Sequence, residues 1–252
     1  MNVLVALAIL LLIFMLLIGG KKGGKSFISL LLNFAVFILL LFFTMDPNIN
    51  PVFVTFIASI AMVMINLFFV NEVNLKTKIA FGSTMITLCL LVFLMKWIVH
   101  ISLVQGFAAE EIVELAPFSL KIGIDFTQLF VMIVMISTVG AITDVAIAIS
   151  SPMKEIVEHH PNIERKELFQ SGIRIGRDIL GTDTNTLVFA FIGSYLALFL
   201  LFKDLSYSIG EMLNSKIFIG EVITILCASI GIAVIIPITA LINAYFLTKK
   251  AS

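Results

Sequence analysis

Seven apolar stretches follow one another along the chain, separated by segments that hold most of the charged residues. A helix that crosses a bilayer needs about 20 apolar residues, within a range of about 17 to 25. The pattern therefore predicts an all-α, polytopic helical membrane protein whose residues 1–252 form a single transmembrane domain. Its seven transmembrane helices are expected at residues 2–18, 27–44, 52–70, 79–99, 123–143, 185–202 and 217–247.

Lysine and arginine residues are unevenly divided between the connections, and this bias predicts the orientation. Of the sixteen, Lys121 falls in the fourth connection, Lys203 and Lys216 fall in the sixth, the second has none, and Lys96 lies near the end of the fourth span. The other twelve all lie in the first, third and fifth connections or at the C-terminal end. Because basic residues favour the cytoplasmic side, they predict an N-terminus outside and a C-terminus in the cytoplasm. They are Lys21, Lys22, Lys25, Lys76, Lys78, Lys154, Arg165, Lys166, Arg174, Arg177, Lys249 and Lys250.

Composition agrees with lipid as the main surroundings of the chain. Hydrophobic residues make up 60% of it and charged residues 13%, against about half and about a quarter in soluble domains. The net charge is zero and no basic block is present, so a nucleic-acid partner is not expected. Cys89 and Cys227 each stand alone in an apolar run, so neither a disulfide nor a zinc site is expected. The first stretch has no basic region before it, which favours a retained span over a signal peptide.

Two predicted connections are long. The outer one, residues 101–122, mixes Glu110, Glu111 and Glu114 with apolar residues, as is typical of an amphipathic helix on the membrane surface. The inner one, residues 150–184, is the most polar stretch of the chain and is expected to be a cytoplasmic connection.

A short run in the inner connection has residue types that bind metals. Glu155, Glu158, His159 and His160 lie together, with Glu155 and His159 one helical turn apart. Pro161 follows at once and the segment is expected to be solvated, so a surface charge run is the more typical interpretation.

Residues 19–26 read GGKKGGKS, which fits the spacing of a phosphate-binding loop. That loop cradles phosphate only between a strand and a helix. Here it joins two predicted membrane helices, so we expect a cytoplasmic turn and no nucleotide or other cofactor.

Polar residues gather where the fifth predicted span ends and the sixth begins. Asp144, Asp178 and Asp183 are candidate acceptors for a cation or proton, because oxygen-rich sites suit hard cations and protons. Further oxygens would come from Thr143, Thr182, Thr184 and Asn185, and Arg174 and Arg177 would act as charge partners or hold an anionic substrate.

The same residues also allow a purely structural interpretation. Both Asp144 and Asp183 border full-length apolar windows and could lie at the cytoplasmic interface, while Asp178 could pair with Arg174 one turn away. Small residues that would permit close helix packing occur at Gly140, Gly172, Gly176, Gly181 and Gly193. No nucleophile–base pair is placed for catalysis, so an enzyme is not expected.

The C-terminal half resembles the YibE/F-like family of bacterial multi-pass membrane proteins. The resemblance rests on residues 140–146 (GAITDVA), 171–172 with 175–178 (SG and IGRD), 181–182 with 184–186 (GT and TNT) and 189–194 (FAFIGS). Asp183 stands where the family pattern has an apolar residue, which favours Asp144 and Asp178 as the shared site.

The resemblance implies a permease-like protein of the bacterial cytoplasmic membrane, of the shorter type that lacks an extracytoplasmic domain. It further implies a hetero-oligomer with a longer YibE-type partner. Together with the polar cluster, this predicts a subunit that moves a small solute or ion through a site between the fifth and sixth spans. The alternative is a non-transporting scaffold or assembly partner, for which the small residues would be the main feature.

Overall fold

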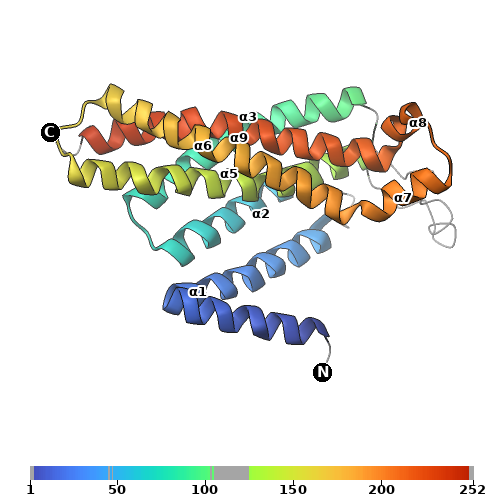
Figure 1. Ribbon diagram of the computed structural model, residues 1–252, viewed down its shortest axis with the longest axis horizontal. Coiled ribbons are helices and arrows are strands. Elements are labelled where there is room, and N and C mark those ends of the chain that lie inside the picture. The colour runs from blue at the N-terminus through green and yellow to red at the C-terminus, as the bar shows by residue number, and fades with distance from the viewer. Residues whose placement is uncertain (1–2, 45, 47, 103, 105–124, 250–252) are drawn as a thin grey trace.

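The computed structural model describes residues 3–44, 46, 48–102, 104 and 125–249, and over these it is all-helical (Figure 1). The predicted outer amphipathic connection falls almost entirely outside the described residues. The elements are α1 (Val3–Thr44), α2 (Pro51–Met64), the π-helical η1 (Ile65–Phe69), α3 (Leu75–Ser102), α5 (Phe126–His159), α6 (Arg165–Ser194), α7 (Leu196–Asp204), α8 (Ile209–Asn214) and α9 (Lys216–Lys249).

Helix α1 contains a sharp bend at Gly20, where φ is 54° and ψ is −134°. This backbone conformation is open to glycine but strained for residues with a Cβ. The helix resumes at once, and Gly23 packs so closely on the backbone of Met15 that no side chain would fit. Figure 1 shows the two arms of α1 diverging from the bend in a V. Residues 19–26 therefore form a bent helix, without the strand that a phosphate-binding loop requires.

The core lies where α3, α5, α6 and α9 meet. Leu88 of α3, Ile142 of α5, Ile232 of α9 and Leu168 of α6 are all fully buried in one hydrophobic cluster. Helices α5 and α9 run parallel, since Phe130 lies against Gly220 near their N-terminal ends and Ser150 bonds to Asn243 near their C-terminal ends. Burial of apolar side chains between helices, together with a few polar bonds, holds this four-helix unit together.

Two interhelical hydrogen bonds are donated by asparagines of the predicted spans. Asn33 Nδ2 of α1 donates to Asn66 Oδ1 in η1 at 2.7 Å, and Asn243 Nδ2 of α9 donates to Ser150 Oγ of α5 at 2.9 Å. Side-chain amides commonly link helices in this way inside membranes.

Five helical segments are long and apolar enough to cross a membrane: α1, α2 with η1, α3, α5 and α9. Helices α6 and α7 make a sixth if this pair, bent by 52°, counts as one span. The count is below the seven predicted because the first two predicted spans are both contained in α1. Large apolar side chains such as Leu17 and Phe93, 75% and 76% exposed, cover the outside of the protein, as expected where lipid is the solvent.

Most of residues 150–184, expected as a polar connection, is helical. Helix α5 continues to His159 and α6 begins at Arg165, so only a short turn separates two long antiparallel helices. The buried residues Leu168, Gly172 and Gly176 recur every fourth position and form the face that packs on the core. Most of the charges that made this stretch look like a loop lie at exposed or partly exposed positions of α6, and the others lie in the last turns of α5 or in the turn between the two helices.

Four features lie toward one end of the bundle in Figure 1: the bend of α1, the α2–α3 connection, the α5–α6 turn and the C-terminal end of α9. An ion pair between Lys25 Nζ and Glu72 Oε1, 3.6 Å apart, joins the segment after the bend of α1 to the α2–α3 connection. This basic end of the bundle is where the sequence places most of its lysine and arginine residues.

Candidate functional site

The short α5–α6 turn brings Asp144 of α5 level with the polar part of α6. The carboxylates of Asp144 and Asp183 lie close enough to interact electrostatically. Asp144 is near the middle of α5, and the side chain is exposed, while Asp183 is partly exposed. The structure therefore brings two acidic residues of the predicted cluster together from different helices.

Asp144 points away from the core because the neighbouring positions of α5 point into it. Ile142, Thr143, Val145 and Ala146 are all buried. The face that carries Asp144 also holds Ser137, Gly140 and Ala148, and all four positions are exposed. These residues recur at intervals of three and four and so form one stripe along α5.

Thr143 belongs to the buried side of α5. Its hydroxyl donates to the carbonyl oxygen of Val139 at 2.6 Å, within the same helix. A threonine bonded to its own helix in the core does not reach the carboxylate of Asp144 on the other face. The structure thus separates Thr143 from the acidic pair.

The outer face of α6 carries the other predicted oxygen donors. Asp178, Thr182 and Asn185 are exposed and Thr184 is partly exposed. The Thr182 hydroxyl donates to the carbonyl of Asp178 at 3.0 Å, so its lone pairs still face outward. This face is a continuous polar stripe that ends in the membrane-facing apolar residues of α6.

Arg174 and Arg177 are exposed and border a shallow pocket of about 300 Å³ with Phe169, Gln170 and Ile173. Neither arginine forms an ion pair with an acidic residue in the described part of the chain. The carboxylates of Asp144, Asp178 and Asp183 likewise form no ion pair with a basic residue in this part of the chain. The expected pairing of Arg174 with Asp178 is therefore not made among these residues.

Gly172 and Gly176 are close-packing positions between α6 and its neighbours. A Cβ at Gly172 would lie 2.6 Å from Met153 Sδ and 2.8 Å from Ala240 Cβ, and one at Gly176 would overlap Ile236 Cγ2. The other three predicted packing glycines differ. A Cβ at Gly140, Gly181 or Gly193 would meet open space in the described structure.

The four residues considered for metal binding do not converge. Glu158 instead pairs with Lys154 across 3.2 Å. His159 and His160 border a surface pocket of about 440 Å³ with Glu167. Within the described residues no three histidine, cysteine, aspartate or glutamate side chains come together in an arrangement that could hold a metal ion.

The sequence analysis did not single out Glu221, which the structure pairs with Tyr195. The Tyr195 hydroxyl donates to Glu221 Oε1 at 2.7 Å, at the position where α6 ends and the chain bends by 52° into α7. Glu221 is the only acidic residue in the apolar stretch 217–247, and a lone carboxylate inside a predicted span is itself a signal of function.

Comparison with known families identifies the chain. The family model described as YibE/F-like protein matches residues 7–249, so the chain belongs to this family. The match extends through the N-terminal helices, beyond the C-terminal half on which the resemblance was first seen. No curated protein and no solved structure matches the chain.

Proposed function

We propose that this member of the YibE/F-like family is a permease-like membrane subunit that moves a small cation or a proton past Asp144 and Asp183. The observation that carries the proposal is the association of these two carboxylates, from α5 and α6, without a cationic partner among the described residues. Acidic side chains within membrane helices are costly and commonly mark ion or proton pathways.

The position of Asp144 along α5 supports this role. The next charged residue toward the C-terminal end is Lys154, ten positions later, which corresponds to about 15 Å of helix. The residues between are mainly apolar, so Asp144 is expected to lie inside the hydrocarbon region. A charge at that depth needs a partner or access to water.

The chemistry of the pair favours a cation over an anion. Two carboxylates that interact electrostatically repel each other, and a bound proton or metal cation removes this repulsion. The exposed oxygens of Thr182 and Asp178 continue along α6 from Asp183 toward the basic end of the bundle. They offer a polar path by which a cation reaches the pair.

The proposed topology has seven spans with the N-terminus outside, in a bacterial cytoplasmic membrane. The two arms of α1 supply the first two spans, and α6 with α7 supplies a broken sixth. The arrangement of the turns at one end in Figure 1 supports alternating spans, and the lysine and arginine bias supports a cytoplasmic location for that end.

A second candidate function is assembly. The stripe on α5 and the glycines at positions 181 and 193 are small, exposed and uncovered by any described helix, which suits close packing of another membrane helix. The longer family partner would then cover this face. In that case the chain acts as a scaffold and moves no solute by itself.

The transport proposal is tested by replacing Asp144 and Asp183 with asparagine, separately and together. Proteoliposomes containing the full chain, with and without the longer partner, are loaded with a pH-sensitive dye or with a sodium or potassium indicator. We expect each substitution to abolish cation or proton flux at unchanged protein content. Asp204→Asn, at the exposed end of α7, is the matched control and should keep full flux.

Asp178→Asn separates the pair from the stripe around it. Flux that survives Asp178→Asn but not Asp144→Asn assigns the site to the pair. Full flux in the Asp144→Asn, Asp183→Asn double variant would refute the site. No flux for any of these ions in the wild-type complex, combined with loss of partner binding in Gly181→Leu, would favour the scaffold.

A further inference from the structure

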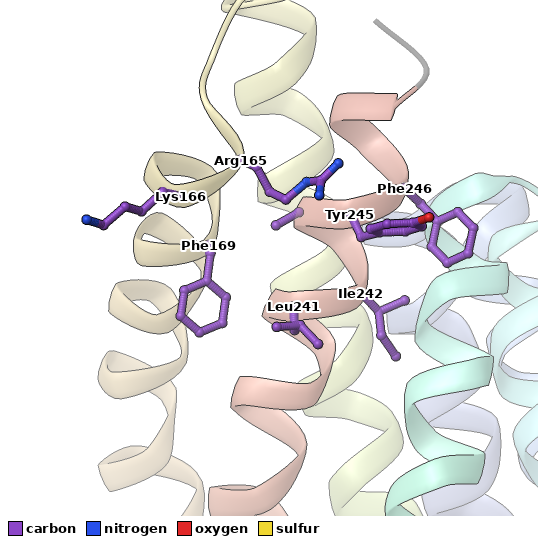
Figure 2. A pocket seen from close by; sticks show the side chains of 8 residues that line it. Arg165, Lys166, Phe169, Leu241, Ile242, Tyr245 and Phe246 are labelled. Carbon is purple, nitrogen blue, oxygen red and sulfur yellow. The ribbon is translucent and has the colours of Figure 1, made fainter. Parts of the chain in front are cut away.

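A groove of about 630 Å³ lies between the N-terminal end of α6 and the C-terminal end of α9, at the basic end of the bundle. It is distinct from the acidic pair and takes no part in the proposed transport. Figure 2 shows its walls, which come from the first turns of α6 and the last turns of α9. They are formed by Arg165, Lys166, Phe169, Leu241, Ile242, Ala244, Tyr245 and Phe246.

The groove divides into a cationic rim and apolar walls. Arg165 and Lys166 are at the end of the groove beside the α5–α6 turn, where Arg165 reaches toward Tyr245 and the Lys166 side chain extends away from α9 (Figure 2). Phe169, Leu241 and Ile242 line the part that runs along the helices. Leu241 is 62% exposed, although leucine is among the most often buried residue types. In a membrane helix such exposure means contact with a lipid chain.

Arg165 is held in place without losing its charge. The guanidinium lies 4.9 Å from the centre of the Tyr245 ring, and Nε donates to Thr248 Oγ1 at 3.4 Å. A guanidinium has five N–H donors, so most of them stay available for an incoming oxyanion. Stacking on an aromatic face fixes the orientation of the planar group.

The positive charge at the rim is not neutralised by the neighbouring glutamates. Glu164 and Glu167 flank the two basic residues in the sequence, but in the described structure neither lies within ion-pair distance of Arg165 or Lys166. Glu167 instead borders the separate pocket that His159 and His160 line. The rim is therefore locally cationic although the chain as a whole is neutral.

We propose that this groove binds an anionic phospholipid, with the phosphate on Arg165 and Lys166 and an acyl chain along Phe169, Leu241 and Ile242. Arginine forms strong bidentate bonds with phosphate. Basic pockets at the ends of membrane helices commonly bind anionic headgroups, and tyrosines such as Tyr245 are enriched at the headgroup level. The apolar walls select a lipid over a free phosphate ion, and the uncompensated charge selects an anionic over a zwitterionic headgroup.

The test is native mass spectrometry of the full chain in detergent, titrated with phosphatidylglycerol or phosphatidylcholine of the same acyl chains. The wild type should retain phosphatidylglycerol preferentially. The double variant Arg165→Gln, Lys166→Gln should bind phosphatidylglycerol about 30-fold more weakly. Each basic residue near an anionic headgroup contributes about 1 kcal/mol to binding, and the variant removes two of them. Binding of phosphatidylcholine should change little.

Two further variants keep the outcome clear if the double variant folds poorly. Leu241→Trp fills the apolar part from an exposed position and should reduce retention of both lipids. Lys78→Gln removes an exposed charge on α3, outside the groove, and should leave the preference unchanged. Equal retention of the two lipids by the wild type, or a loss of preference in Lys78→Gln as large as in the double variant, would overturn the proposal. Inorganic phosphate that displaces the lipid completely would do the same.

Discussion

The contact between Gly176 of α6 and Ile236 of α9 gives the sharpest test of the packing. Gly176→Ala adds one methyl group, and the structure has Ile236 Cγ2 overlapping the position of that methyl, with Cγ1 only 3.0 Å away. Ile236 is buried at 6% exposure and belongs to the core cluster, so it has little room to move. The two helices must separate slightly or Ile236 must leave its preferred rotamer.

The magnitude follows from two opposed effects. Alanine is better than glycine inside a helix by about 1 kcal/mol, whereas inserting a methyl group into a packed core costs about 1–3 kcal/mol. Gly181→Ala lies in the same helix and meets open space, so only the helix-forming effect applies there. We therefore expect Gly176→Ala to be less stable than Gly181→Ala by about 1–3 kcal/mol.

The assay is unfolding of the purified protein in mixed micelles with increasing dodecyl sulfate, followed by circular dichroism. A double-mutant cycle with Ile236→Ala identifies the contact, because removing Cγ1 and Cγ2 makes room for the new methyl. The two substitutions should be non-additive by about 0.5–3 kcal/mol. If Gly176→Ala is as stable as Gly181→Ala, or if the cycle is additive, α6 does not pack on α9 in this register.

Three further predictions concern single positions. Gly20→Ala should strain the bend of α1 by about 1–3 kcal/mol, because φ is 54° there. The distribution of distances between spin labels placed on the two arms should then broaden, and an unchanged distribution would argue against the bend. Asn243→Leu removes the bond to Ser150 and should lower the free energy of unfolding by about 0.6–2 kcal/mol in the dodecyl sulfate assay, whereas no loss would mean that the bond does not form. Tyr195→Phe removes the hydroxyl that donates to Glu221 and should speed the reaction of Glu221 with an apolar carbodiimide, measured by peptide mass spectrometry; an unaltered rate would show that the carboxylate was already free.

Hydropathy was sufficient to predict the apolar helices, because a bilayer demands long apolar segments whatever the tertiary packing. The predicted stretch 217–247 corresponds to α9, which runs from Lys216 to Lys249. The stretch 79–99 likewise falls within α3. These segments are set by the solvent, and their detection needs no knowledge of neighbouring helices.

Helix α6 was harder to predict, because a hydropathy average cannot distinguish a polar loop from a helix with one polar face. Arg174, Asp178 and Thr182 lower the average, yet they share the outer face of a continuous helix. Its inner face was present in the sequence as Leu168, Gly172 and Gly176, spaced by four. Periodicity, rather than mean hydropathy, carries this information.

The association of Asp144 with Asp183 could not be read from the chain. It depends on the length of the α5–α6 turn and on how far each helix extends, and both differ from what the apolar windows predicted. The family pattern pointed to Asp178 instead, because Asp183 stands at a normally apolar position. Proximity between two helices is a property of their register, which a single sequence does not contain.

The first arm of α1 makes few demands on its own sequence. Its most apolar window is 0% buried within the protein, so lipid contacts nearly every side chain between Val3 and Gly20. Exchanging leucine, isoleucine, valine or phenylalanine at the exposed positions there disturbs no buried side chain and should be close to neutral. The sequence of this arm can therefore vary widely as long as it stays apolar. The opposite limit applies to α6, where a single methyl group added at Gly176 meets the buried side chain of Ile236.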